Sequence, residues 1–333
     1  MDVRTTPPLD RRDFIKGAAA GIALLPHTGL GSLAFGAPQQ RSTVAVIHTD
    51  DRRDGVTRAF ELLQPSGIAG KHVVIKPNFN TADPTPAGTH NDTLAQLVTE
   101  LQERDARAVT LGESSGPPAT DGVMEQKGIP DMAACMDFDV VNFEEIPDAD
   151  WLPVNPAGTH WPEGFYLPRQ VVDAEYLVST CCLKTHGFGG VFTMSLKLSV
   201  GLTPKSLRRG MHRSPDMRRM IAELNQGYRP QLIVLDGVEA FTDGGPSSGE
   251  LKTADVFIAG SDRVAVDAVG LAMLKHLGAN EDIMSRPIFA QEQIARAVEV
   301  RLGVTGPDEI RLVSDDPAGW SYAETLNGIL AQG

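Results

Sequence analysis

Lysine, histidine and carboxylate side chains recur in this chain where apolar, β-branched segments end. The segment ends in question read "VVIKPNFN", "TLGESSG", "CLKTHGFGG" and "VLDGVEAFTDGGPSSG". A lysine ammonium group binds carboxylate or phosphate, an imidazole transfers protons near neutral pH, and a carboxylate orients the imidazole or shares its proton. The residues that fit these roles are Lys76, Asn78, Glu113, Lys184, Thr185, His186, Asp236 and Asp243.

The stretch "CLKTHGFGGVFTMSLKLSVGL", residues 182–202, concentrates this chemistry further. Its glycines would let backbone N–H groups approach a ligand, and the residues after them predict a helix over 191–200. A helix N-terminus favours anions, and Lys184 with Thr193 would add a charge and a hydroxyl. Lys197, in an otherwise apolar helix, should either extend to solvent or serve a pocket.

One carboxylate stands in an apolar helical pattern. Asp267 lies in "VAVDAVG", within a helix that Ser261 or Asp262 can cap. We expect Asp267 to pair with a pocket lysine, and a cap-type contact is the alternative.

The elements that would position these residues alternate between strands and helices. Strands are predicted over 43–47, 72–76, 108–112, 175–181, 231–235, 256–259 and 310–313, and helices over 51–63, 91–104, 261–274 and 288–302. This order predicts an α/β fold with a mainly parallel sheet and helices on both faces. Parallel strands end at one edge, where ligands bind, so we expect Lys76, Glu113, Lys184 and His186 to share one cavity.

The N-terminus has the features of an export signal. The pair Arg11 and Arg12 precedes Phe14 and an apolar run over 17–25, and small residues follow over 31–37. Residues 1–37 therefore resemble a twin-arginine signal peptide. Pro26 ends the run well short of the roughly twenty residues that a membrane span needs. The expected organisation is a signal over 1–37, a linker over 38–42, one α/β domain over 43–315 and a C-terminal helical tail over 316–333.

Charge and cysteine content exclude several kinds of partner. The formal net charge is −13, which argues against nucleic acid or an anionic membrane as a partner and makes clustered lysines more informative. The three cysteines, Cys135, Cys181 and Cys182, include no Cys-x-x-Cys pair. No iron–sulfur cluster is therefore expected.

The motifs together resemble a catalogued but uncharacterised family, domain of unknown function 362. The matching pieces are "VVIKPNF", "GES", "LKTH" with its glycine-rich turn, "SLKLSVGL" followed by His212, "VLDGVEAFTDGGPSSG" and "IAGSDRVAVDAVG". They occur in the family's order over residues 43–315. Some members carry ferredoxin-type cysteine motifs, which this chain lacks. The resemblance supports the fold and the site, and it implies no particular reaction.

Three functions remain open on these residues. The first is an exported enzyme acting on a small anionic substrate, with His186 as acid or base, Glu113 or Asp236 as its partner, and ligand contacts from Lys76, Asn78, Lys184, Thr185, Lys197 and Asp267. The second is a divalent-metal enzyme with ligands from His186, His212 and Asp243, Glu113 or Asp236. The third is a non-catalytic periplasmic binding or cofactor-maturation protein. A serine hydrolase lacks its Gly-x-Ser-x-Gly elbow here, and a dinucleotide fold lacks its glycine fingerprint.

The export prediction has a direct test. Arg11→Lys together with Arg12→Lys should trap the precursor in the cytoplasm, because the twin-arginine translocase reads the arginine pair. Cell fractionation measures this, with the wild-type precursor as control. Normal export of the double variant would contradict the prediction. Export of the wild-type protein in cells that lack this translocase would contradict it as well.

Overall fold

Nine strands form one mixed sheet in the computed structural model, which describes residues 41–332. The strands run in the order β11-β1-β10-β9-β7-β2-β3-β4, and β8 pairs with β7. Their bounds are β1 (Ser42–His48), β2 (His72–Lys76), β3 (Ala108–Glu113), β4 (Asp139–Asn142), β7 (Tyr176–His186), β8 (Val191–Thr193), β9 (Leu232–Gly244), β10 (Gly249–Gly260) and β11 (Ile310–Val313). A separate antiparallel pair joins β5 (Trp151–Val154) to β6 (Phe165–Pro168).

Most neighbouring strands of the large sheet are parallel. The exceptions are β10, which runs antiparallel to β1 and β9, and β8, which forms a hairpin with β7. Strands β2, β3, β4, β7 and β9 therefore end at one edge. The predicted α/β class with a mainly parallel sheet is confirmed.

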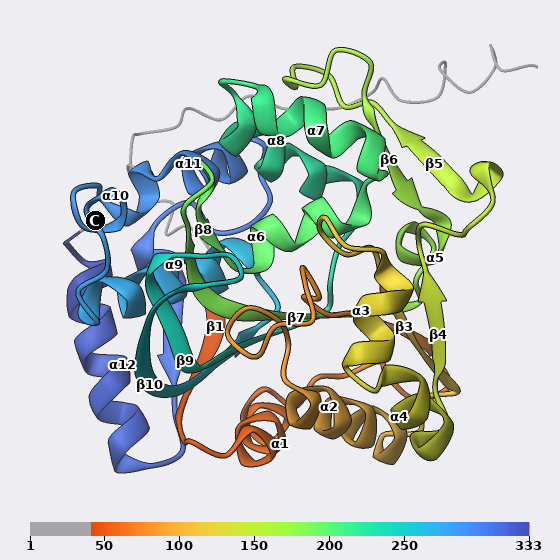
Figure 1. Ribbon diagram of the computed structural model, residues 1–333. Coiled ribbons are helices and arrows are strands. Elements are labelled where there is room, and N and C mark those ends of the chain that lie inside the picture. The colour runs from red at the N-terminus through yellow and green to blue at the C-terminus, as the bar shows by residue number, and fades with distance from the viewer. Residues whose placement is uncertain (1–40, 333) are drawn as a thin grey trace, which may run out of the picture. The chain divides into compact units, whose positions relative to one another are not determined.

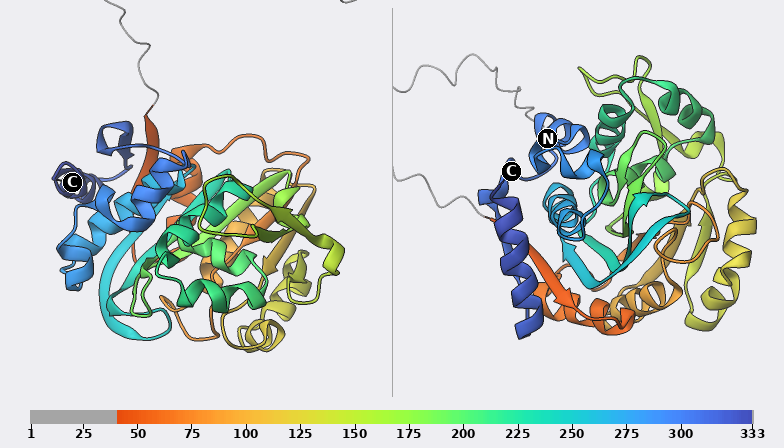
Figure 2. Two further views of the ribbon diagram at one scale, coloured as in Figure 1. Left: turned by 90° about the horizontal axis from the view of Figure 1, so that it is seen from above. Right: turned by 60° about the vertical axis from the view of Figure 1, so that its left-hand side comes forward.

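Helices cover both faces of the sheet (Figures 1 and 2). On one face lie α1 (Arg52–Leu63), α2 (Asn91–Glu103), α3 (Thr120–Gln126) and α4 (Ile129–Met136), and on the other α6 (Ser195–Leu198), α8 (Met217–Leu224), α9 (Arg263–His276), α11 (Glu292–Glu299) and α12 (Pro317–Leu330). The alternation of side chains along β1 shows the two layers, because Ala45 and Ile47 join the α1–α2 core whereas Val44 and Val46 join the α9 core. The remaining α-helices of the described residues are α5 (Arg169–Val172), α7 (Lys205–Arg213) and α10 (Glu281–Met284).

The segment expected to be one helix over 191–200 differs from that prediction. Val191–Thr193 form β8 and pair with Lys184–His186, and only then do α6 and the 3-10 turn η3 (Ser199–Leu202) follow. The β-branched and aromatic residues of "VFT" favour a strand, and the glycine turn before them closes the hairpin. Strand β7 thus extends to His186, and its cysteines, Cys181 and Cys182, are buried free thiols within it.

Asp267 caps a helix instead of pairing with a lysine. Its two carboxylate oxygens accept hydrogen bonds from the backbone N–H groups of Ser195 (2.8 Å) and Leu196 (2.9 Å), at the start of α6. Burial raises the pKa of Asp267 to about 7, although both N–H groups favour the ionised form. Asp267 lies on the buried side of α9 against α6, where these N–H groups need an acceptor.

Two further observations bear on the predicted organisation. The signal over 1–37 and most of the linker lie outside the described residues. Within residues 41–332, no helix has the length and apolar character needed to cross a bilayer.

Removing the Asp267 carboxylate should loosen α6. Asp267→Ala leaves two buried N–H groups without acceptors, so we expect the free energy of unfolding to fall by about 2–4 kcal/mol. Urea denaturation measures the change, with exposed Asp50→Ala as the matched control. A loss below about 1 kcal/mol would show that the cap contributes little.

Candidate functional site

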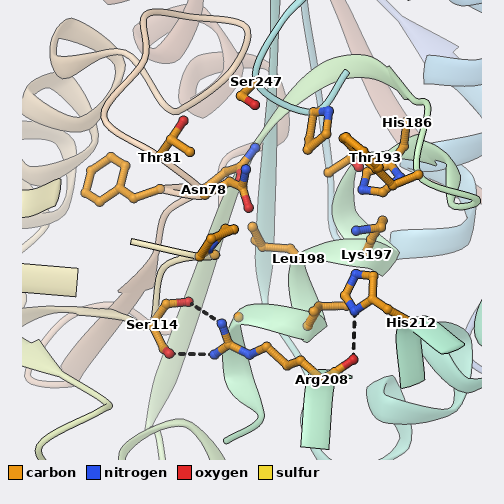
Figure 3. Close-up of a pocket in the computed structure, with 18 of the residues that line it drawn as sticks. Asn78, Thr81, Ser114, His186, Thr193, Lys197, Leu198, Arg208, His212 and Ser247 are labelled. Atoms are coloured by element: carbon orange, nitrogen blue, oxygen red, sulfur yellow. Dashed lines mark hydrogen bonds between the residues drawn. The ribbon is translucent and has the colours of Figure 1, made fainter. Parts of the chain in front are cut away.

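A pocket of about 1050 Å³ opens at the edge where the parallel strands end (Figure 3). Its walls come from the loops after β2 and β3, the β7–β8 turn, the α6–η3 segment, α7 and the turn between β9 and β10. Segments far apart in the sequence thus meet here, as expected for the carboxyl edge of an α/β sheet.

A buried ion pair joins two of these strands at the pocket wall. Lys76, the last residue of β2, donates from Nζ to Glu113 Oε1 at 2.6 Å, and both side chains are about 2% exposed. Glu113 also accepts hydrogen bonds from the backbone N–H groups of Phe79 (2.8 Å) and Ser114 (2.7 Å). The carboxylate is therefore engaged by three donors, an arrangement that fits a structural anchor better than a catalytic base.

The α6–η3 segment rests directly on this ion pair. A Cβ atom at Gly201 would lie 2.9 Å from Lys76 Nζ and 3.1 Å from Glu113 Oε1. A larger residue at 201 would therefore displace the pair or the segment. The close approach brings Lys197, one turn earlier, to the pocket wall.

Lys197 is a buried lysine without a partner. Its side chain is 8% exposed, and no hydrogen bond or ion pair to it exists among the described residues. Burial, together with the charges of Lys184 and Arg208, lowers the pKa of Lys197 to about 7. A buried cation that lacks a carboxylate is costly unless a ligand compensates it.

His186 is held as a hydrogen-bond donor toward the pocket. Its Nδ1 accepts from the Gly190 N–H at 3.3 Å, which leaves the proton of the neutral ring on Nε2. Burial, together with the charges of Lys197, His212 and Lys184, lowers the pKa of His186 to about 2. A ring this weakly basic is a poor proton acceptor in the free protein, so the expected role of His186 as a base is not favoured.

His212 has the complementary tautomer. Its Nδ1 lies 2.7 Å from the carbonyl oxygen of Arg208 and must donate to it, which leaves a lone pair on Nε2. Burial lowers the pKa of His212, and the charge of Lys197 lowers it further, against the hydrogen bond to Arg208. In the view of Figure 3, Lys197 lies between His186 and His212. His212 is thus the better candidate for a general base.

Arg208 fastens α7 to the loop after β3. Its guanidinium donates to the carbonyl oxygens of Thr203, Ser114 and Ser115 and to the Ser114 hydroxyl. Burial lowers the pKa of Arg208 to about 10, and no described carboxylate lies within ion-pair distance of it. Its charge is therefore available to an anion in the pocket.

The pocket lining is strongly cationic. It includes six lysines and arginines but a single carboxylate, Glu113, which is already paired. Two buried polar atoms of the lining, Asn78 Nδ2 and Thr193 Oγ1, lack hydrogen-bond partners among the described residues. In a chain of net charge −13, this excess of positive charge favours an anionic ligand.

Two residues expected in the pocket lie behind its wall. Lys184 is fully buried and donates from Nζ to the carbonyl oxygens of Ala87 (2.5 Å) and Pro246 (3.1 Å). The Thr185 hydroxyl donates to the Phe241 and Gly244 carbonyl oxygens. Both residues tie loops together and do not line the cavity.

Two of the expected carboxylates, Asp236 and Asp243, lie away from the pocket as well. Asp236 points to the α1–α2 face, where it pairs with Arg52 at 3.0 Å and accepts from the Thr93 hydroxyl. Asp243 lies on the surface and accepts from Asn280 Nδ2. The set proposed for a divalent metal is therefore not assembled, and the described part of the chain holds no cluster of three or more His, Cys, Asp or Glu that could bind an ion.

The sequence did contain a signal for the cationic residues that were missed. The lining includes Lys205, Arg208, Arg209 and Arg213 from the run "KSLRRGMHR". These positions recur three and four residues apart, so α7 presents them along one side. The segment does not follow a strand, so the rule that ligands bind beyond strand ends does not select it.

Sequence comparison assigns the family. The profile of the domain of unknown function 362 (DUF362) matches residues 73–272. The chain belongs to this family. The chain is similar to the thylakoid-associated protein sll1697 of Synechocystis sp. (strain ATCC 27184 / PCC 6803 / Kazusa). The two are 25% identical over 281 residues, which cover 80% of this chain and 82% of that protein.

A likeness among solved structures is more distant. The lactate racemase apoprotein from Thermoanaerobacterium thermosaccharolyticum matches with a TM-score of 0.46 and 15% identity, over 88% of each chain. No functional conclusion rests on a likeness at that level. The DUF362 assignment confirms the resemblance drawn from the motifs.

Lys197 and Lys184, which are both buried, should respond oppositely to replacement by methionine. Lys197→Met removes an uncompensated charge, so at pH 7 it should raise the free energy of unfolding by on the order of 2–4 kcal/mol. Since the pKa of Lys197 is lowered by folding, the penalty is complete below about pH 7 and fades toward pH 10.5. Lys184→Met should instead cost about 1–3 kcal/mol, because two carbonyl oxygens lose their donor.

Denaturant titrations of both variants at pH 7 and pH 10 measure this contrast. A destabilised Lys197→Met protein would show that Lys197 has a structural role. A stable Lys184→Met protein would remove the distinction between the two lysines.

Proposed function

We propose that this protein is an enzyme that acts on a small anionic molecule bound in the cationic pocket. The observation that supports this most is Lys197, which is buried and has no hydrogen-bond or ion-pair partner within residues 41–332. It lies beside a lining whose single carboxylate is already neutralised. Natural proteins rarely keep such a cost in the core unless function requires it.

Each side chain has a role in this proposal. Lys197 and Arg208 supply positive charge to the anionic group, and His186 donates a hydrogen bond to it from Nε2. The amide of Asn78 and the hydroxyl of Thr193 offer the polar atoms that lack partners. His212, with its Nε2 lone pair free, accepts a proton from the bound molecule and returns it. Lys76 and Glu113 hold the walls in place.

The alternative is a protein that binds the same anion without converting it. The opposite tautomers of His186 and His212 favour the enzyme, since a site built only for anion binding would gain from two donors. A divalent-metal enzyme has less support. Two of its proposed carboxylates, Asp236 and Asp243, face other parts of the molecule, and Glu113 is already paired with Lys76.

The proposal includes the place where the protein acts. The arginine pair and short apolar run of residues 11–25 support export by the twin-arginine translocase, which would be a partner during transport, and hence a periplasmic or secreted location. This route carries folded proteins, so the pocket would be assembled before export.

Anion binding should weaken as pH rises above neutrality. Lys197 is protonated below its pKa of about 7, so sulfate meets a charged lysine there. Above that pH, binding must take up a proton, and affinity should fall by up to about tenfold per pH unit. Calorimetry with sulfate, which does not itself titrate in this range, measures the effect. Lys197→Met should abolish both the binding and the pH dependence, whereas Lys184→Met should retain them.

Sulfate binding that is equal at pH 6 and pH 9, or unaffected by Lys197→Met, would contradict the proposed site. Catalysis has a separate readout. His212→Gln should keep sulfate affinity within about twofold while the turnover of metabolites in a cell extract, followed by mass spectrometry, is lost. If the wild-type protein leaves the metabolites of the extract unchanged, the result would favour a protein that binds the anion without converting it.

A further inference from the structure

We propose that the natural ligand carries two anionic groups joined by an apolar body, one held at Lys197 and the other at Arg209 and Arg213 of α7. This inference rests on the proposed function and names the class of substrate for the same pocket. Dicarboxylic acids and phosphorylated organic acids belong to this class.

Arg209 and Arg213 form an outer cationic group at the pocket. They lie four residues apart on α7, so they project from one side of that helix, and both line the pocket while remaining exposed. Neither guanidinium has a hydrogen-bond or ion-pair partner anywhere in residues 41–332. Two adjacent arginines without a carboxylate repel each other, and an anion between them would relieve that repulsion.

Other basic residues of this region are compensated. Lys205 lies 2.8 Å from Glu144, Arg218 lies 3.0 Å from Glu292, and Arg219 lies 3.1 Å from Asp216. The absence of any hydrogen-bond or ion-pair partner within residues 41–332 thus distinguishes Arg209 and Arg213 from the other basic residues of α7 and α8. It does not follow from a general shortage of acidic residues, because the chain has 43 of them.

The inner and outer cationic groups differ in environment. Lys197 and His186 are buried, whereas Arg209 and Arg213 are exposed. One sulfate-sized anion is far smaller than a pocket of about 1050 Å³, which matches ligands of the size of a substantial organic molecule.

The remaining lining suits an apolar body. Phe79, Leu198 and Val200 contribute to the walls, and Phe188, at 72% exposed, extends from the β7–β8 turn. A ligand that pairs an inner and an outer acid across this apolar lining satisfies both cationic groups at once.

Alkanesulfonates and alkanedisulfonates of matched chain length test the proposal, because they differ only in the second charge and do not titrate. At the best chain length, the second sulfonate should improve affinity by about tenfold or more, from two partly exposed arginine contacts. Arg209→Gln with Arg213→Gln should remove that gain and leave the affinity for the monosulfonate within about twofold. Lys197→Met should abolish the binding of both.

The control separates local contact from overall charge. Arg219→Gln with Arg286→Gln removes the same two charges from outside the pocket and should leave the gain intact. Monosulfonate binding that depends on Lys197, with no gain from a second sulfonate or with equal losses in both double variants, would overturn this inference and leave the proposed function standing. A protein that binds neither sulfonate nor sulfate would overturn the proposed function itself.

Discussion

The ion pair between Lys76 and Glu113 is the interaction on which the site depends. It joins the ends of β2 and β3, and its carboxylate accepts hydrogen bonds from the backbone N–H groups of Phe79 and Ser114. The α6–η3 segment packs against the pair at Gly201. The pair also has an electrostatic consequence. Because it engages the one carboxylate of the pocket, Lys197, Arg208, Arg209 and Arg213 line the cavity without a counterion among the described residues.

Rigidity around Lys197 is provided by other residues, of which Arg208 also contributes charge. Asp267 fixes the start of α6, Arg208 fastens α7 to the loop after β3, and Lys184 ties two loops together behind the wall. These contacts hold Lys197 where burial and neighbouring charges bring its pKa to about 7. A lysine near its pKa can respond to a ligand by taking up a proton, which a fully solvated lysine cannot do at neutral pH.

The sequence was sufficient to predict the sheet, most of its strands and part of the site. The rule that parallel strands end at one edge correctly brought Lys76, Glu113 and His186 to the pocket. It failed for Asp236 because side chains alternate between the faces of a sheet, and Asp236 belongs to the α1–α2 side. It failed for Lys184 because its ammonium group turns to the loop carbonyl oxygens of Ala87 and Pro246. A one-residue difference in where a strand ends decides the face, and sequence patterns do not fix strand ends that closely.

Other features were beyond the reach of sequence patterns. The tautomers of His186 and His212 depend on single backbone groups, the Gly190 N–H and the Arg208 carbonyl oxygen. The cap provided by Asp267 joins α9 to α6, and Asp267 lies 72 residues from Ser195 and 71 residues from Leu196 in the sequence. Such contacts follow from the packed structure. The i, i+4 spacing of the arginines on α7, in contrast, is visible in the sequence, but this segment does not follow a strand.

The most direct test of this account is the pKa of Lys197 itself. Nuclear magnetic resonance of protein labelled at the lysine ε-position, assigned with Lys197→Met, follows its titration with and without sulfate. The account predicts that Lys197 titrates near pH 7 in the free protein and that sulfate moves this pKa upward. A Lys197 that titrates near its ordinary value of about 10.4, or whose pKa does not change with sulfate, would contradict it.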